Sequence, residues 1–183
     1  MTHHLCRLLA ALLILLAGGC GYRFSGEGLG PRPGLQRLAI PVFENSTSEP
    51  DIGAMFAGEL RKEFIRKGPF SIVDQSEAEA VFQGRIKSIQ TSAVSHHSAE
   101  IVGGARLTLE VRLYVSMDIR CVDARTGEVL WQDPNFSYNR VYRQVQDPNA
   151  PDPIISFNNR REAVSVIAEE VATRIHDRFL SNF

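Results

Sequence analysis

The segment from Arg106 to Cys121 reads RLTLEVRLYVSMDIRC, and it decides how the rest of the chain must fold. Apolar residues fill every odd position of this segment, while the even positions carry polar or charged residues and Tyr114. Unbroken alternation without Gly or Pro predicts a half-buried β-strand, because successive side chains of a strand point to opposite faces. Each large apolar side chain stabilises a fold by roughly 1.5–3 kcal/mol when fully buried, so other elements must cover the odd face.

Shorter or less regular patterns on either side supply those elements. Apolar residues recur at helical spacing from Ile52 to Phe64 and again from Ala163 to Phe179, which predicts two amphipathic helices. A capping serine at Ser48 and the early Pro50 are typical of the start of the first helix. Further strands are expected at Leu35–Phe43, Phe70–Val73, Val81–Val94 and Val129–Val145. The order strand, helix, several strands, helix predicts an α+β two-layer sandwich, with a mixed, mainly antiparallel sheet of about four strands covered by two helices.

The segments that connect the predicted strands and helices also have recognisable sequence patterns. Asp123–Glu128 is expected to form a hairpin, with Gly127 available for positive φ. Pro134 interrupts the return strand and predicts a bulge or an edge position there, as Pro41 does in the first strand. Loops are expected at Ser95–Gly104 and at Gln146–Asn158. A membrane barrel is excluded because barrels need at least eight such strands and this chain has three or four.

The first twenty residues are typical of an export signal. Leu8–Ala17 is an uninterrupted apolar run that is too short to span a bilayer, and it is followed by small residues and Cys20. Ala17-Gly18-Gly19-Cys20 resembles a bacterial lipobox, which implies cleavage before Cys20, attachment of a diacylglycerol to its sulfur and acylation of the new amino terminus. An ordinary secretory signal with an incidental cysteine is the alternative. Gly21, where Asp would favour retention, indicates the outer membrane by resemblance to enterobacterial sorting.

The chain therefore divides into a lipoprotein signal peptide at residues 1–19, a lipidated flexible tether at 20–34 and an α+β domain at 35–183. The tether assignment rests on the Gly and Pro content of Gly21–Gly34. Several acyl chains, at about 0.8 kcal/mol per buried methylene, would anchor the protein stably on the periplasmic face of the membrane.

Cysteine usage indicates whether the domain has disulfides, and the net charge indicates which classes of partner it can bind. Of three cysteines, Cys6 leaves with the signal and Cys20 is the lipidation residue, so Cys121 cannot form an internal disulfide and is expected to be a small buried residue. Loss of residues 1–19 removes Arg7 and leaves 19 basic against 21 acidic residues, a net charge of −2. This balance argues against nucleic acid as a partner, and any anionic lipid must be bound by a local patch.

Patterns that carry catalysis are missing from the sequence. His96 and His97 are adjacent in an expected loop and have no Cys, His or carboxylate cluster beside them, so we predict neither a metal site nor a cofactor. Gly103-Gly104 precedes a strand and not a helix, and no nucleophile elbow or zinc-protease motif occurs. We therefore expect a protein that is not an enzyme.

Three segments resemble the LptE family of lipopolysaccharide (LPS) assembly lipoproteins. They are CGYRFSG from Cys20, LAIPVFENST from Leu38 with Glu49-Pro50 after it, and AEAVFQGRIKSI from Ala78. The order of elements also matches over essentially the whole mature chain. The resemblance implies a non-enzymatic subunit of the outer-membrane LPS translocon, which plugs a large β-barrel partner of the LptD type, assists its assembly and contacts LPS.

The resemblance transfers no LPS-contacting residue to this sequence, but the main strand offers candidates. Arg106, Arg112 and Arg120 share its even face, where they form either a solvated surface balanced by Glu110 and Asp118 or a row that binds lipid phosphates or carboxylates of the barrel. Two other classes stay open: a generic periplasmic lipoprotein adaptor of another transport or secretion complex, and a hydrolase with dispersed catalytic residues.

Overall fold

The computed structural model describes residues 30–97, 107–146 and 153–181. The predicted signal, Cys20, the tether before Gly30 and Arg106 lie outside the described residues, so the predicted boundaries at 19 and 34 stay predictions. In chain order the elements are β1 (Arg37–Ala39), β2 (Glu44–Asn45), α2 (Ile52–Lys67), β3 (Ser71–Ile72), β4 (Ala80–His97), β5 (Leu107–Asp123), β6 (Val129–Gln146) and α3 (Pro153–Ser181). None of the described helices combines the length and apolarity that crossing a membrane requires.

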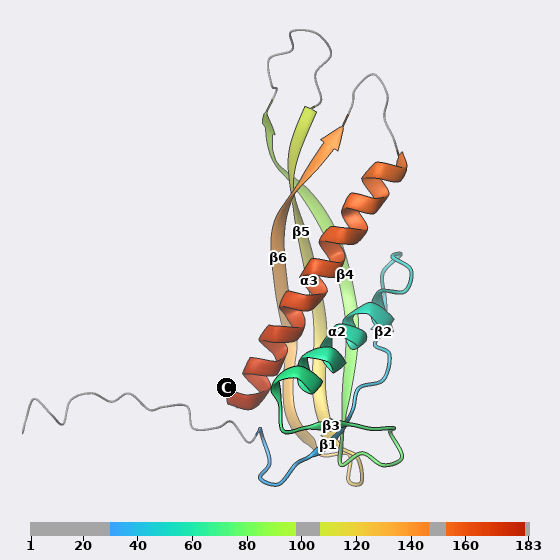
Figure 1. The fold of residues 1–183 in the computed structure, drawn as a ribbon, viewed down its shortest axis with the longest axis vertical. Helices are drawn as coiled ribbons and strands as arrows, with labels where there is room; N and C mark the ends of the chain where they lie inside the picture. The colour runs from blue at the N-terminus through green and yellow to red at the C-terminus, as the bar shows by residue number, and fades with distance from the viewer. Residues whose placement is uncertain (1–29, 98–106, 147–152, 182–183) are drawn as a thin grey trace, which may run out of the picture.

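All the described strands belong to one sheet, in the order β3-β1-β4-β5-β6, with β2 also paired to β4. The long strands β4, β5 and β6 are antiparallel, whereas β1 and β2 run parallel to β4 and β3 runs parallel to β1. Helices α2 and α3 lie on one face of this sheet (Figure 1). The predicted two-layer α+β class is confirmed. The sheet has six strands where about four were expected, because Leu35–Phe43 contributes β1 only up to Ala39 and Pro41, which has no amide hydrogen, separates it from β2.

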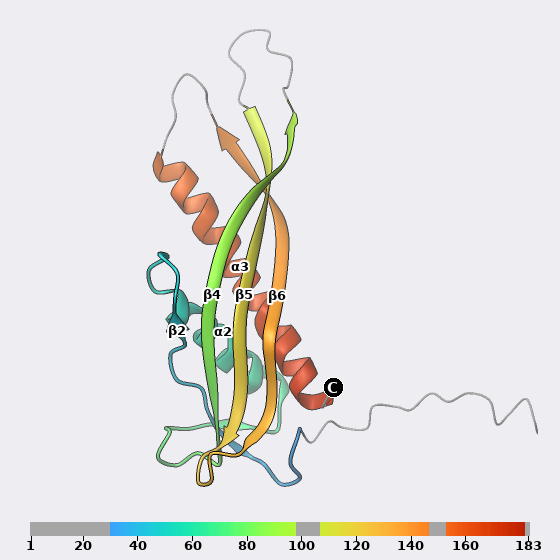
Figure 2. The ribbon, with the colours of Figure 1, turned by 180° about the vertical axis from the view of Figure 1, so that it is seen from behind.

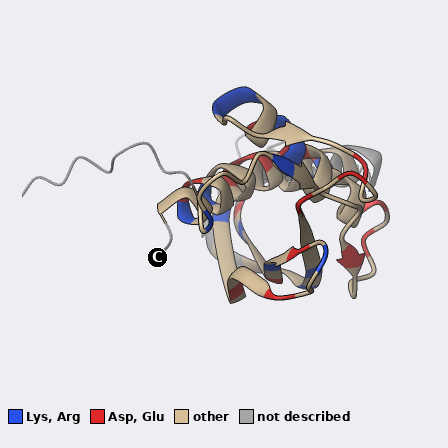
Figure 3. Cartoon of the chain, turned by 90° about the horizontal axis from the view of Figure 1, so that it is seen from below, with Lys and Arg blue, Asp and Glu red and all other residues tan. Residues whose placement is uncertain are grey.

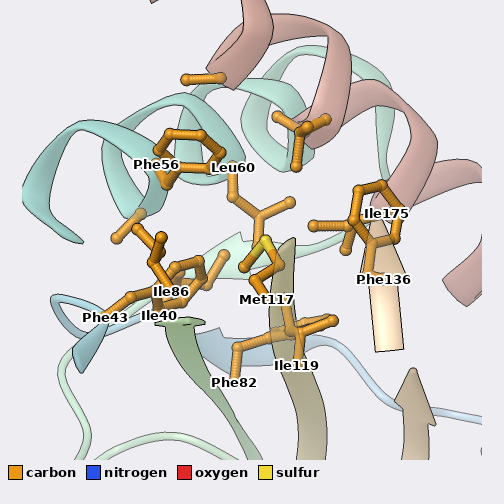
Figure 4. Packing of buried hydrophobic residues seen from close by; sticks show 14 of the residues in the cluster. Ile40, Phe43, Phe56, Leu60, Phe82, Ile86, Met117, Ile119, Phe136 and Ile175 are labelled. Carbon is orange, nitrogen blue, oxygen red and sulfur yellow. The ribbon is translucent and has the colours of Figure 1, made fainter. Parts of the chain in front are cut away.

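The faces of β5 are as the alternation predicts. Its odd residues from 111 to 121 are at most 8% exposed and pack under the two helices, as Figure 4 shows for Met117 and Ile119. Phe56 and Leu60 reach this layer from α2, and Ile175 reaches it from α3. The helices are thus the cover that the apolar face of β5 requires.

Two turns follow their sequence signals. Gly127 has φ +74° in the hairpin between β5 and β6, a conformation that glycine adopts without strain. On β6, Phe136 pairs with Met117 and Asp133 pairs with Ile119, so one extra residue is accommodated at Pro134-Asn135. This is the predicted bulge, and it shifts the inward-facing residues of β6 from odd to even positions.

Three predicted ends are wrong. Residue Asp51, with φ 57°, precedes α2 and makes no side-chain cap, so Ser48 does not cap this helix. The expected loop at Gln146–Asn158 is helical from Pro153 onward, because proline fits the first turn of a helix, whose amide hydrogens have no partner within the helix. The residues Ser95–His97, expected in a loop, belong to β4, which continues through His97 by pairing with β5.

The LAIPVFENST segment serves packing. The ring of Phe43 lies over β4 at Gly84, where a Cβ would come within 2.6 Å of the ring, and the Gly53 site leaves only 2.1 Å between a Cβ and the Phe43 carbonyl oxygen. Next to it, Asn45 Oδ1 accepts hydrogen bonds from Thr47 N and Oγ1 at 2.8 and 2.7 Å. These contacts fix the turn that leads into α2.

Candidate functional site

The face of the sheet opposite the helices carries the candidate site. No described helix covers it, and β4, β5 and β6 lie side by side in front of the helices in Figure 2. The even residues of β5 point to this outer face, with Tyr114 41% exposed at its centre. Register places Gln90 and Asn139 on either side of Tyr114, and Ser88 and Ser137 on either side of Ser116. The outer face is therefore polar over most of its length.

A hollow of about 670 Å³ occupies the part of this face nearest to the β5–β6 hairpin. Its floor comes from the three long strands, and Val42, 62% exposed, stands on its rim. The polar side chains that line it are Glu44, Gln75, Gln83, Arg85, Asp118, Arg120 and Gln132. It is thus a polar, open depression built by β4, β5 and β6 together with the segment around β2.

Most charges around the hollow are compensated. Arg85 Nε donates to Glu44 Oε2 at 2.6 Å, and this hydrogen bond raises the pKa of Arg85. Lys87 Nζ lies 2.7 Å from Asp118 Oδ1 and 3.2 Å from the carbonyl oxygen of Pro134, so it ties β4 to the bulge of β6. These pairs leave little net charge on this side of the depression.

Arg120 differs from its basic neighbours. Its Nε donates to the neutral Gln83 Oε1 at 2.8 Å, and no carboxylate of the described ranges pairs with it. The side chain is exposed in the hollow. An exposed guanidinium with a neutral partner keeps its full charge and several free N–H donors, which suits phosphate or carboxylate groups.

Arg112 lies on the same face, in a different environment. It is half-buried between Ser92 on β4 and Val141 on β6, and its Nε is buried without a hydrogen-bond partner among the described residues. Val141 is 39% exposed beside it. Arg112 therefore has a buried donor without a partner among the described residues, beside the partly exposed Val141.

The structure places Arg112 and Arg120 together on one face but not at one site. Eight residues separate them along β5, which corresponds to about 26 Å in a strand. The Lys87–Asp118 pair lies between them along the strand, and Arg106 lies outside the described residues. A single phosphate cannot bridge the two arginines, so they represent two separate positions on the outer face.

Apart from Asp118, the polar residues that line the hollow beside Arg120 were not predicted from the sequence. Glu44 and Arg85 meet only because β2 pairs in parallel with β4, and Lys87 reaches Asp118 because it is the extra residue at a register shift of β4. One signal was available: Gly84 inside a strand is typical of a close approach by another segment, here Phe43.

The remaining residues considered for chemistry are the His96-His97 pair and Cys121. His96 and His97 end β4, with side chains outside the described set, and within the described ranges no three His, Cys, Asp or Glu side chains gather to hold a metal ion. Cys121 is fully buried, and this burial raises the pKa of its thiol to about 12. A thiol in that state is a packing residue and not a nucleophile.

Comparison with known proteins gives a family match. The sequence model of the family LptE, described as lipopolysaccharide-assembly, matches residues 35–179. The comparison with curated proteins gives no match.

Solved structures match at low identity and with TM-scores below 0.5. Rare lipoprotein B from Shewanella oneidensis is 15% identical, with 80% of this chain and 92% of that chain covered and a TM-score of 0.41. A lipoprotein from Caulobacter crescentus is 17% identical over 76% and 89% of the two chains, with a TM-score of 0.46. PelC from Paraburkholderia phytofirmans, a dodecamer, is 12% identical over 85% and 91%, with a TM-score of 0.42. Likenesses this distant say nothing about function.

Proposed function

The chain belongs to the LptE lipopolysaccharide-assembly family, and from this premise we propose that it is a non-enzymatic lipoprotein subunit of the outer-membrane LPS translocon. In this proposal Cys20 carries the lipid anchor, a large β-barrel of the LptD type is the partner that the domain plugs and helps to assemble, and the outer sheet face contacts LPS. The role in LPS assembly comes with the family. The partner, the anchor and the LPS contact are the parts to be tested.

The observation that carries the LPS contact is Arg120 in the open hollow. LPS presents phosphate groups, and a guanidinium forms two charge-assisted hydrogen bonds with neighbouring phosphate oxygens. Arg120 has only a neutral partner, whereas Arg85 and Lys87 near it are already paired with carboxylates. Among the described residues, the hollow therefore offers Arg120 as a cation without a carboxylate partner, within a frame of polar side chains.

The partner is tested by copurification from detergent-solubilised outer membranes. The proposal expects a stable complex with a large barrel, and removal of the protein should deplete the mature barrel and make the envelope leaky. A stable partner of another kind would overturn this reading and favour a generic lipoprotein adaptor.

The LPS contact is tested by charge reversal at single positions, because Arg112 and Arg120 are too far apart to act on one phosphate. We expect Arg120→Glu to weaken LPS binding by the purified protein several-fold, and Arg112→Glu to weaken it less, while circular dichroism shows an unchanged fold. Arg125→Glu is the matched control, since it makes the same charge change at an exposed arginine in the β5–β6 hairpin. Equal losses for Arg120→Glu and Arg125→Glu would show that only the overall charge matters.

A further inference from the structure

The chain just before β1 is held against the end of the domain formed by the β5–β6 hairpin. Arg32 forms an ion pair with Asp123, the last residue of β5. Asp123 Oδ1 also accepts hydrogen bonds from the backbone amides of Arg125 and Thr126 at 2.9 and 2.8 Å. These hydrogen bonds and that of Arg32 lower the pKa of Asp123, so it is a charged acceptor at neutral pH. One carboxylate thus ties the incoming chain to the hairpin.

Packing reinforces this attachment on both sides of Arg32. The backbone of Gly30 lies against two rings, so that a Cβ there would come within 3.2 Å of Phe179 and 3.6 Å of Phe70. Leu35 is 4% exposed, and Glu79 Oε2 accepts hydrogen bonds from the amides of Gln36 and Arg37 at 2.9 and 3.0 Å. The described chain is consequently held against the rest of the domain from Gly30 onward.

Gly30 lies at one end of an elongated molecule. We call this end the base and define it by Gly30–Leu35, β1, β3 and the hairpin Asp123–Glu128, which lie together in Figure 1. Asp123 of β5 lies at the base, and Leu107, at the other end of this strand, lies 16 residues away, which is about 53 Å of strand. The far end of the long strands is thus well separated from the point where the chain leaves.

The tether is short compared with that length. Ten residue steps separate Cys20 from Gly30, and a fully extended chain covers at most about 35 Å in ten steps. A flexible chain of this length has a typical end-to-end distance of only about 17 Å. If Cys20 is anchored, an orientation with the far end of the strands on the membrane would need a tether longer than the chain provides.

We propose that the base is the end of the domain that lies nearest to the lipid bilayer, and that the Arg32–Asp123 pair fixes the exit of the tether there. This inference rests on the anchor at Cys20, which belongs to the proposed function, but not on the barrel partner or on LPS. Basic and acidic residues are intermixed over the base, as seen from below in Figure 3. Glu79 pairs with Arg37 there, as Asp123 does with Arg32. The reach of the tether, and not a basic patch, therefore keeps the base near the membrane.

The test uses the lipidated full-length protein in phosphatidylcholine vesicles that contain a small fraction of lipid with an energy acceptor on its headgroup. A fluorophore is attached to a new cysteine at the base (Glu128→Cys) or about 36 Å along the sheet (Ser92→Cys), both at exposed positions. Labelling is selective, because Cys121 is buried and the pKa of its thiol is raised to about 12. We expect several-fold stronger energy transfer from the base. Equal or reversed transfer would overturn the proposal.

Three comparisons separate the causes. Cys20→Ala should abolish energy transfer from both positions, and retention of the pattern would mean that the base binds lipid without the tether. Raising the salt to 1 M should leave the pattern unchanged, whereas its loss would assign the orientation to charge. Arg32→Ala should reduce the difference between the two positions, while the matched variant Arg125→Ala should not. Equal behaviour of these two variants would rule out the ion pair as the fixing contact.

Because the vesicles contain neither barrel nor LPS, this experiment can fail while the barrel and LPS parts of the proposed function hold, and the reverse is also true.

Discussion

The two faces of β5 come from the same seventeen residues but are organised in different ways. The inner face is a continuous row of buried apolar side chains, and its role follows from the alternation alone. The outer face is a set of polar side chains whose partners come from β4, β6 and the β2 segment. Burial acts on every residue of a face alike, whereas polar function depends on which individual groups are brought together. The difference can be tested by changes made to each face.

The largest expected effect is a charge placed on the inner face. Leu113 is fully buried, so Leu113→Asp puts a carboxylate without a partner into the core and should cost at least several kcal/mol, enough to prevent folding. The neighbouring Arg112→Ser changes the outer face and should change the free energy of unfolding by less than about 1 kcal/mol. Thermal unfolding followed by circular dichroism measures both. Similar melting temperatures would show that the faces are assigned wrongly.

A second comparison concerns how much two ion pairs stabilise the fold: a buried pair in α2 and an exposed pair on the outer face. Glu63 of α2 is 5% exposed, and Lys67 Nζ lies 2.8 Å from its Oε1. Burial alone would raise the pKa of Glu63, but hydrogen bonds from Lys67, Arg66 and Thr173 outweigh burial and lower it from 4.5 to about 2. A folded-state pKa below the unfolded one stabilises the protein above about pH 4.5, and this contribution is lost as the pH falls towards 2.

We therefore expect Glu63→Gln to lower the free energy of unfolding by about 3 kcal/mol at pH 7, with the gap to the wild type closing between pH 5 and 2. Asp118→Asn, which removes the carboxylate from the exposed pair with Lys87, should cost less than about 1 kcal/mol. Urea titrations at a series of pH values measure both. A gap for Glu63→Gln that persists at pH 2 would contradict the assigned pKa.

The elements that the sequence predicts well are those whose signals are local. The alternation of β5, the bulge at Pro134 and the positive φ of Gly127 depend on neighbouring residues, and all are confirmed. The start of α3 at Pro153 was missed because three prolines outweighed the helical pattern, although a proline in the first turn is compatible with a helix.

The site was less predictable than the fold because it depends on pairing between distant segments. The positions of Arg112 and Arg120 on the outer face follow from alternation, and their separation follows from strand geometry. The hollow around Arg120 does not, since Glu44 reaches Arg85 across 41 residues of sequence. Hydrogen bonds of this kind leave no periodic pattern in the chain.

The smallest effect tests a place where a distant segment completes the inner face of the sheet. Gly84 of β4 pairs with Ile119, and the ring of Phe43 occupies the space where a side chain would lie. Gly84→Ala should cost about 1–3 kcal/mol, because the ring must move in a closely packed layer. Gly58→Ala is the matched control in α2: a Cβ there meets nothing within 4 Å, and alanine should stabilise the helix by up to about 1 kcal/mol. Urea unfolding should therefore show a lower free energy of unfolding for Gly84→Ala and a higher one for Gly58→Ala. A neutral Gly84→Ala would mean that Phe43 has room to shift, and that the LAIPVFENST segment is not held by its packing against the sheet.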